Sequence, residues 1–291
     1  MNGMAGVLRR GEMRDVMEKY VRPEKNPGTA CSGCGLRLAH RKVLEAIDEL
    51  GLGLGDVVWG TGIGCSGRQT FVTWKGDTFA GTHGRVYAMA TGLRLALPPE
   101  KRLILTVGDG DAFTIGFLHL LNCARRNVDM TVVVFDNLGY QSTGGQYGVT
   151  TPLGSRTDSS PYGAWEPNWT QGGFDVLRIL KEAGATFLAR HTVLQGHEPV
   201  ESLKRAIRNR GLSLVQLIYP CVTHYGAQAL GTRDLAKIYD WFRDRTVESI
   251  DADSSDSFTT GIFHDAVGSR PEFAASMREF VASVQKEGNH G

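Results

Sequence analysis

Two polar side chains follow apolar runs that are typical of buried β-strands, and together they could bind a metal ion. The apolar run 103–107 ends at a Gly-Asp-Gly turn whose carboxylate belongs to Asp109, and a second run, 130–135, is followed closely by Asn137. Because ligands of open parallel sheets bind beyond the carboxyl ends of the strands, we expect Asp109 and Asn137 to lie side by side. Their oxygens suit Mg²⁺, which takes near-octahedral oxygen ligation and is commonly completed by water and phosphate.

The glycines of the same turn indicate what accompanies the metal. Gly108 and Gly110 carry no side chain, so backbone N–H groups at this turn can approach an anion closely. A helix predicted to begin near Ala112 would direct its positive end to the same place. We therefore interpret the segment as a clamp for a metal ion and a diphosphate, with an ordinary structural turn as the alternative.

Four of the five cysteines lie in loop-like, glycine-rich sequence. They are Cys31 and Cys34 in a Cys-x-x-Cys motif, Cys65, and Cys221. Thiolates on such turns can converge on one ion or cluster without strain. Cys123 differs, because it falls in the helical stretch 115–126 among leucine and alanine, and we predict that it is a small core residue.

Spacing alone leaves the use of these cysteines open. Residues 1–20 mix polar and charged side chains without a signal peptide, so a cytoplasmic location is expected and disulfides are disfavoured. Structural zinc usually takes two Cys-x-x-Cys pairs, and only one is present here. Zinc and an iron–sulfur cluster both remain compatible with the pattern.

The composition is that of a compact enzyme subunit. Of 291 residues, 41% are apolar and 22% are charged, which allows a substantial core, and 37 glycines indicate many tight loops. The net charge of +1 and the lack of a long apolar run argue against nucleic acid or a membrane as a main partner.

The order of the predicted elements indicates an α/β protein with a doubly wound, mainly parallel sheet of five or six strands. Helices are predicted at 36–50, 85–97, 174–183 and 200–209, and strands at 56–59, 103–107, 130–135, 185–190 and 214–219. We divide the chain into an N-terminal arm at 1–26, a main domain at 27–225 and a helical tail at 226–291 that contacts other subunits. A long polar loop at 139–173 is expected to be functional, with a solvated insertion as the alternative.

The spacing of the clamp resembles a known cofactor signature. Gly-Asp-Gly followed after twenty-six residues by Asn137 resembles the thiamine diphosphate motif of transketolases, decarboxylases and 2-oxoacid oxidoreductases. This resemblance implies the pyrophosphate-domain fold of those enzymes. It also implies that Asp109, Asn137 and the carbonyl of Gly139 hold magnesium, while Asp111 and Thr143 help to hold the diphosphate.

The combined motifs resemble one family more specifically. Between Pro27 and Tyr225, the order Cys-Ser-Gly-Cys-Gly, Gly-Ile-Gly-Cys-Ser-Gly, His-Gly-Arg, Gly-Asp-Gly-Asp and Pro-Cys-Val-Thr resembles the β subunit of a 2-oxoacid:ferredoxin oxidoreductase, of the 2-oxoglutarate type. The resemblance implies a single [4Fe–4S] cluster and a thiamine diphosphate site. The cluster ligands would be Cys31, Cys34, Cys65 and Cys221, and the diphosphate would contact Gly64, Gly108, Gly110, Asp111, Thr143 and Gly144.

The same resemblance implies the reaction and the partners. A 2-oxoacid and coenzyme A would give an acyl-CoA and CO₂, with electrons passing through the cluster to ferredoxin, and the reverse carboxylation would use the same residues. A separate α subunit would supply the pyrimidine-side domain and its glutamate, so we expect activity only in an assembly, as a dimer of αβ units.

Three further residues are candidates for catalysis. Arg68 follows the Cys65 loop and could pair with a substrate carboxylate, although a surface arginine is the simpler interpretation. His83 stands in the segment that resembles the family's His-Gly-Arg motif, and Thr143 lies in the predicted loop. We favour 2-oxoglutarate as the substrate, with succinyl-CoA as product. The alternatives are a pyruvate:ferredoxin oxidoreductase and a non-redox thiamine diphosphate decarboxylase or synthase.

Overall fold

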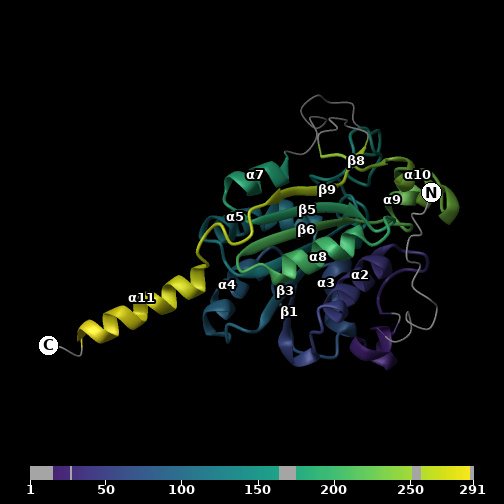
Figure 1. The fold of residues 1–291 in the computed structure, drawn as a ribbon. Coiled ribbons are helices and arrows are strands. Elements are labelled where there is room, and N and C mark those ends of the chain that lie inside the picture. The colour runs from purple at the N-terminus through teal and green to yellow at the C-terminus, as the bar shows by residue number, and fades with distance from the viewer. Residues whose placement is uncertain (1–15, 27, 164–174, 251–256, 289–291) are drawn as a thin grey trace, which may run out of the picture.

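A seven-stranded sheet forms the centre of the protein in a computed structural model that describes residues 16–26, 28–163, 175–250 and 257–288 (Figure 1). The strand order is β2-β1-β3-β4-β6-β5-β9, and every neighbouring pair is parallel except β5 and β9. In that order the strands span Thr78–Ala80, Val57–Thr61, Arg102–Gly108, Met130–Asp136, Leu212–Ile218, Phe187–Thr192 and Gly261–Asp265. The predicted fold class is confirmed, but the sheet has seven strands rather than five or six.

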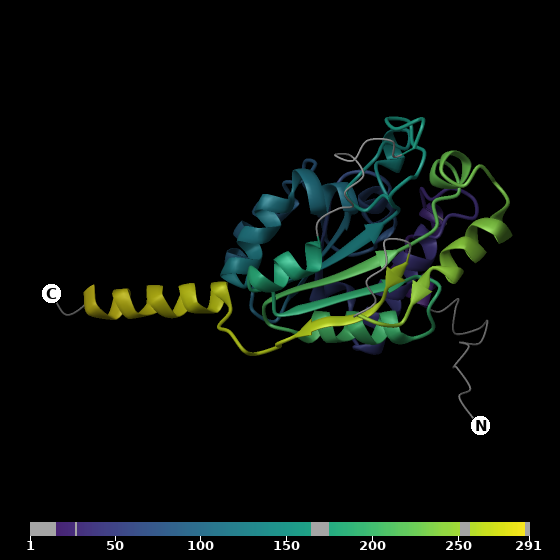
Figure 2. The same ribbon diagram turned by 90° about the horizontal axis from the view of Figure 1, so that it is seen from above.

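Helices cover both faces of the sheet, as Figure 2 shows from above. On one face lie α2 (Leu36–Glu49), α3 (Cys65–Thr73) and α8 (Glu198–Arg208). On the other lie α4 (Val86–Ala96), α5 (Phe117–Arg126) and α7 (Val176–Glu182). This is the doubly wound arrangement that the alternating sequence pattern predicts. It confirms Cys123 as a core residue, because its side chain is buried between α4 and α5.

The central strand β4 shows why its sequence is continuously apolar. All seven of its residues are buried. Val133 and Phe135 contribute to the core under α2 and α8, whereas Val132 and Val134 contribute to the core under α4, α5 and α7. Because both faces of a parallel strand are covered, the strand has no polar side that would give an alternating pattern.

Strands β3 and β4 are neighbours with Gly108 opposite Phe135, so the residues that follow each strand meet at one edge of the sheet. A single π-helical turn, η3 (Asp111–Ile115), connects β3 to α5. The polar segment after β4 contains the short helix η4 (Gln141–Thr143). The predicted loop at 139–173 is therefore partly ordered, with bridges that pair Tyr140 with Gln146 and Thr157 with Ser160, while residues 164–174 lie outside the described residues.

The predicted arm and tail are not separate from the main domain. Residues 1–15 lie outside the described residues, but residues 16–20 are helical, and Tyr20 is fully buried and stacks on Trp74 with 5.6 Å between the ring centroids. The short helices η1 (Pro23–Lys25) and η2 (Leu54–Asp56) lie on either side of α2 in the chain. The arm is thus anchored to the core through Tyr20 and Val21, while residues 23–26 are exposed.

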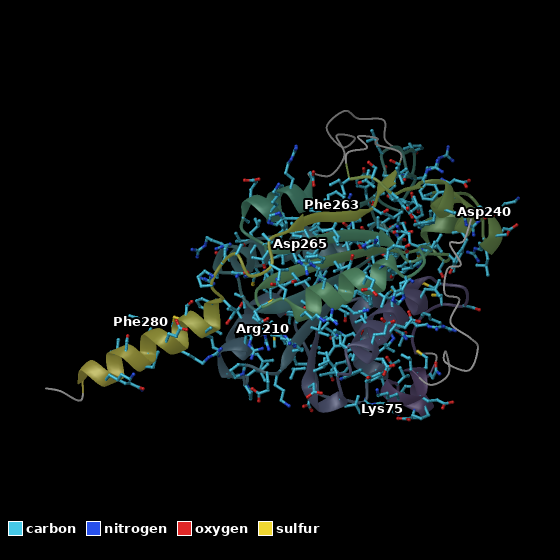
Figure 3. All side chains as sticks on the ribbon, viewed as in Figure 1. Lys75, Arg210, Asp240, Phe263, Asp265 and Phe280 are labelled. Carbon is cyan, nitrogen blue, oxygen red and sulfur yellow. The ribbon has the colours of Figure 1, made fainter. Side chains whose placement is uncertain are left out.

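The tail is not purely helical, because β9 pairs with β5 and completes the main sheet. It also contains α9 (Tyr225–Gln228), α10 (Leu235–Asp244) and a small parallel pair, β7 (Thr246–Val247) with β8 (Phe258–Thr259). The last helix, α11 (Phe273–Gly288), projects from the body (Figures 1 and 2), and Phe280 lies near its middle, 63% exposed (Figure 3).

Candidate functional site

Two buried carboxylates lie side by side at the edge where β3 and β4 end. Asp109 is 4% exposed and Asp136 is fully buried. The Thr150 hydroxyl oxygen lies 2.9 Å from Oδ2 of Asp109 and 2.9 Å from Oδ1 of Asp136. A hydroxyl has only one hydrogen to donate, so it cannot satisfy both carboxylates at once. Two ionised carboxylates that lie this close also repel each other, and a proton or a bound cation would relieve that repulsion.

Burial raises the pKa of Asp109 well above its ordinary value, and the charge of Asp136 raises it further. Burial raises the pKa of Asp136 as well, although the Leu138 N–H, the Gln216 amide and the Thr150 hydroxyl lower it in part. In the protein alone, ionising both carboxylates costs free energy because they are buried and close together. A divalent cation bound beside them would make the ionised form favourable. The chemistry of these donors therefore fits magnesium.

The segment after β4 is held in a strained conformation that presents the other predicted magnesium ligands. Leu138 is buried with φ +65°, an uncommon value for a residue with a branched side chain. Its N–H donates to Oδ1 of Asp136 at 2.8 Å, and the N–H of Gly139 donates to Oδ2 of Asp109 at 2.9 Å. The second bond brings Gly139 to Asp109, and Asn137 lies two residues before Gly139 in the same segment.

The carboxylate of Asp111 ties three segments of the site together. Oδ2 accepts a hydrogen bond from the Ile63 N–H at 2.8 Å, and Oδ1 accepts one from the Gly84 N–H at 2.8 Å and hydrogen-bonds to Nδ1 of His83. Asp111 is 1% exposed, whereas the His83 side chain is 38% exposed. The buried carboxylate therefore fixes the His83 ring through Nδ1, and no hydrogen bond to the other ring nitrogen, Nε2, is recorded in the described part of the chain.

Glycines stand where the site leaves no room for a side chain. A Cβ atom on Gly110 would come within 2.4 Å of the Tyr140 ring. Gly64 has φ +95° and precedes α3, where a residue with a side chain would be strained. Gly108 is the last residue of β3. The structure thus brings together Gly108, Gly110 and Asp111, and the Ile63–Asp111 hydrogen bond places the loop of Gly64 beside them.

The remaining predicted residues lie on the exposed rim. Arg68 is exposed on α3, and its guanidinium pairs with no carboxylate in the described part of the chain. Thr143 is exposed at the end of η4, with its hydroxyl 3.1 Å from the carbonyl of Tyr140, and Gly144 follows with φ +132°. Ser142 of the same turn hydrogen-bonds to the Cys65 thiol, which places η4 beside the start of α3.

The four predicted cluster cysteines come from three segments that contact one another. The Cys34 N–H donates to the Cys31 carbonyl at 3.0 Å, and the N–H of Gly35 donates to the carbonyl of Pro220 at 3.0 Å, which joins this turn to Cys221. On its other side the turn is held by α3, because Oε1 of Gln69 accepts hydrogen bonds from the N–H groups of residues 29 and 30. Cys65 is not in a loop as its sequence suggests, since it is the first residue of α3.

The thiols interact electrostatically as one group. The pKa of Cys34 is raised to about 12, mainly by burial and to a smaller extent by Cys221, Cys31 and Cys65, although the Leu36 N–H lowers it in part. Burial also raises the pKa of Cys221, while the backbone N–H groups of residues 223–225 lower it. N–H groups that point at sulfur stabilise a thiolate, and such hydrogen bonds also tune iron–sulfur clusters.

The distances between cysteine sulfurs bear on the two metal centres that the sequence left open. In the part of the chain that the structure describes, no three cysteine sulfurs lie within 4.8 Å of one another. Tetrahedral zinc would hold its sulfurs about 3.8 Å apart. A [4Fe–4S] cluster spaces its thiolates more widely because each binds a different iron atom. All five cysteines are free thiols.

The sequence did not identify several residues of the site. Asp136 and Thr150 bridge to Asp109, Gln216 donates to Oδ2 of Asp136 at 2.6 Å, and Tyr219 accepts a hydrogen bond from Asn137. Asp136 could have been found, because it is a polar residue at the end of an apolar run, directly before Asn137. Thr150, Gln216 and Tyr219 carry no sequence signal, because only the folded arrangement of the loop after β4 and of β6 brings them to this edge.

The comparisons with known proteins define the class of protein. Residues 57–217 match the family described as thiamine pyrophosphate enzyme, C-terminal TPP binding domain. This match covers more than half of the chain and includes β1 to β6. The chain therefore carries the thiamine diphosphate-binding domain of a thiamine-dependent enzyme. No helix in its described residues is long and apolar enough to cross a membrane.

The relatives specify the family. The chain is 31% identical to 2-oxoglutarate synthase subunit KorB of Methanocaldococcus jannaschii over 92% of this chain and 98% of the relative, and 35% identical to the subunit of that name in Archaeoglobus fulgidus over 92% of each. A solved structure of 2-oxoglutarate:ferredoxin oxidoreductase from Magnetococcus marinus, with 2-oxoglutarate, coenzyme A and succinyl-CoA bound, matches with a TM-score of 0.76 and 28% identity, over 91% of this chain and 90% of that one. The chain belongs to the β subunits of the 2-oxoacid:ferredoxin oxidoreductases.

Proposed function

We propose that this β subunit serves the CoA-dependent oxidative decarboxylation of 2-oxoglutarate to succinyl-CoA and CO₂, with electrons leaving through a [4Fe–4S] cluster to ferredoxin. The observation that carries the proposal is the presence of two sites in one chain: the buried carboxylates beside Asn137 and the four cysteines around residues 34 and 221. A non-redox thiamine enzyme needs only the first. The same residues would serve the reverse carboxylation.

The residues around the carboxylate pair would hold the metal and the diphosphate. Asp109, Asn137 and the Gly139 carbonyl are the proposed magnesium ligands, and Gly64, Gly108, Gly110 and Gly144 allow the backbone to approach the diphosphate. Asp111 would act by aligning the N–H groups of residues 63 and 84 and the ring of His83, since its own charge would repel a phosphate. Thr143 would contact the diphosphate from the rim.

When bound, thiamine diphosphate supplies the electron sink for decarboxylation and the cluster accepts electrons one at a time. The protein orients the substrate and keeps water away from the reacting carbon. His83 would meet the substrate or the diphosphate through Nε2, because Asp111 holds Nδ1. The four thiolates would come from Cys31, Cys34, Cys65 and Cys221.

The choice of 2-oxoglutarate rests on Arg68 and on the relatives. The exposed guanidinium of Arg68 has no carboxylate partner among the described residues. Burial raises the pKa of the Cys65 thiol, and the charge of Arg68 is close enough to offset a small part of that rise. A guanidinium can bind the second carboxylate of a dicarboxylic acid through two hydrogen bonds. Pyruvate has no such carboxylate, and it is the second candidate because part of the pocket would come from another subunit.

The surface beside the site supports the need for an α subunit. Four apolar side chains around His83 and Asp111 are between 47% and 68% exposed; they are Ile63, Met89, Ile115 and Leu118. Exposed apolar groups that border an active site are typical of a subunit interface. We propose that the α subunit covers this face, supplies the pyrimidine-side glutamate and forms a dimer of αβ units in the cytoplasm.

The proposal is tested by co-expressing the chain with its α subunit under anaerobic conditions. We expect about four iron atoms and one thiamine diphosphate per αβ pair. Ferredoxin reduction should require coenzyme A and be faster with 2-oxoglutarate than with pyruvate. Arg68→Leu should weaken the use of 2-oxoglutarate while pyruvate turnover changes little.

Three outcomes would change the assignment. Faster turnover of pyruvate would move the chain to the pyruvate enzymes. Bound thiamine diphosphate without iron would indicate a non-redox decarboxylase or synthase. If the Asp109→Ala variant bound thiamine diphosphate and turned over substrate like the parent, that result would contradict the proposed metal site.

A further inference from the structure

A small cavity opens where strand β3 begins, at the opposite end of that strand from Asp109. Its volume is about 230 Å³, and it lies between the ends of α2 and α8. Pockets for drug-sized ligands typically have about 300–1,000 Å³, so this cavity would hold a smaller molecule. Its lining residues are Glu49, Leu50, Leu52, Arg102, Ile207 and Arg208.

Arg102, the first residue of β3, brings a charged donor to this cavity without an acceptor. The residue as a whole is half-buried, but its Nη1 atom is fully enclosed and has no hydrogen-bond partner in the part of the chain that the structure describes. A buried charged group is normally paired or hydrogen-bonded, because water no longer compensates its charge. An acceptor that does not belong to this chain would satisfy Nη1.

The carboxylates around the cavity are bound to other cations. Oδ2 of Asp129 pairs with Arg210 at 3.2 Å. Oε2 of Glu49, in the cavity wall, accepts a hydrogen bond from Nζ of Lys204 at 2.8 Å. Within the described ranges, neither carboxylate forms an ion pair with Arg102.

The backbone at the end of α2 is also engaged elsewhere. The carbonyls of residues 46, 47 and 48 accept hydrogen bonds from the N–H groups of residues 50, 52 and 51, respectively. The carbonyls that would give this helix end its negative character are therefore largely satisfied within the turn. They leave the guanidinium of Arg102 as the dominant charge at the base of the cavity.

Positive charge exceeds negative charge around Arg102. Burial lowers the pKa of Arg102, and the neighbouring charges of Arg210 and Arg94 lower it too, while Asp129 offsets part of this effect. Arg210 lies at this end of the sheet (Figure 3). Asp129 is shared, because it also lies 3.6 Å from Nη1 of Arg94. A bound anion would balance the excess.

A second guanidinium lines the same cavity. Arg208 is exposed at the last position of α8, and it takes part in no recorded ion pair among residues 16–26, 28–163, 175–250 and 257–288. Each guanidinium presents a planar fork of donors that matches a phosphate or carboxylate. The two oxygens of a carboxylate are both used by one fork, whereas a phosphate has further oxygens for a second guanidinium.

We propose that the cavity between Arg102 and Arg208 is a binding site for the phosphate group of a small molecule, either free phosphate or a small phosphate monoester. The site is separate from the carboxylate site, because it lies at the other end of β3. The inference goes beyond the proposed function and does not depend on it.

The experiment uses the complete αβ complex with thiamine diphosphate and magnesium already bound, so that the diphosphate site is filled. Inorganic phosphate and glycerol 3-phosphate are titrated by calorimetry at constant ionic strength. We expect one binding event per β subunit, and a thermal midpoint that rises with the concentration of the bound probe. Acetate should bind at least about tenfold more weakly, because it satisfies only one fork.

Arg102→Met should weaken binding of the phosphate probe about 10–100-fold, since it removes charge-assisted hydrogen bonds. In phosphate-free buffer its thermal midpoint should equal or exceed that of the parent, because the substitution removes an unpaired, partly buried charge. Arg208→Met changes only an exposed side chain, so it should fold even if Arg102→Met does not, and it should weaken binding by a smaller factor. The control is Arg243→Met: this exposed arginine pairs with Asp240 on α10, and its loss should leave phosphate binding unchanged.

Tighter binding of glycerol 3-phosphate would support the inference and identify a monoester as the ligand, whereas tighter binding of inorganic phosphate would support it with the free ion as the ligand. A parent complex that binds neither probe would overturn it. Binding that survives unchanged in Arg102→Met and Arg208→Met, or that falls equally in Arg243→Met, would overturn it as well. A marked fall in the thermal midpoint of Arg102→Met without phosphate would show that the chain itself satisfies this arginine, which also contradicts the inference.

Discussion

Replacing Asp111 by asparagine should both destabilise the protein and loosen the cofactor site. The buried carboxylate accepts hydrogen bonds from the N–H groups of Ile63 and Gly84, each at 2.8 Å, and binds His83. An amide of the same shape has one acceptor oxygen, so its NH₂ group must face a donor on one of the two sides. At least one of these backbone N–H groups is then left buried without an acceptor.

The magnitude follows from these contacts. A hydrogen bond to a charged group contributes about 1.5–3 kcal/mol, and an unsatisfied buried donor costs a similar amount. Asp111→Asn removes one of these hydrogen bonds and replaces the others by weaker hydrogen bonds to a neutral group. We therefore expect the free energy of unfolding to decrease by about 2–4 kcal/mol. For a chain of this size, the thermal midpoint should fall by roughly 3–7 °C.

The assay combines thermal denaturation of the αβ complex with calorimetric binding of thiamine diphosphate in the presence of magnesium. Affinity should fall about tenfold or more, because the loops of Ile63 and Gly84 and the His83 ring lose their common anchor. Asp129→Asn is the control: that carboxylate is 13% exposed, pairs with Arg210 at 3.2 Å, and precedes β4 at the opposite end of the strand from the site. It should lower stability without weakening cofactor binding.

Two results would refute the reasoning. If Asp111→Asn bound thiamine diphosphate as tightly as the parent, the carboxylate would not organise the site. Equal losses of affinity in Asp111→Asn and Asp129→Asn would show that general destabilisation, and not the anchor, weakens binding.

Three further predictions concern other parts of the molecule. Thr150→Val removes the hydroxyl between Asp109 and Asp136 and should weaken magnesium binding about 10–100-fold, measured by calorimetry; an unchanged affinity would show that the hydroxyl does not orient the metal ligand. Cys221→Ser should lower the iron content, whereas Cys123→Ser in the α4–α5 core should keep about four iron atoms, and a full cluster in the first variant would contradict the ligand set. Burial lowers the pKa of His40 to about 4, below the 6.5 of an exposed histidine, so the unfolded chain takes up a proton first as the pH falls. Stability should therefore decrease by about 2 kcal/mol between about pH 7 and about pH 5, and His40→Leu should flatten this decrease in denaturation curves; equal slopes would argue against a neutral, buried His40.

The sequence by itself identified the residues whose roles depend on local pattern. Strands β3 and β4 are visible as apolar runs because both of their faces are buried, and glycines mark the turns where a side chain would clash. Asp109 and Asn137 could therefore be placed at the ends of neighbouring strands. The same reasoning missed α3, because the glycines around Cys65 hide its start and its apolar pattern is weak.

Only the tertiary structure decided which distant residues complete the site. Strand β6 lies beside β4 although β5 precedes it in the chain, and this order brings Tyr219 to Asn137 and Gln216 to Asp136. Strand order depends on how the crossover helices pack, not on the sequence of any one strand. The tail likewise returns to the sheet through β9, which its polar sequence does not indicate. The ligands are thus visible in the sequence, whereas the residues that orient them are determined by packing.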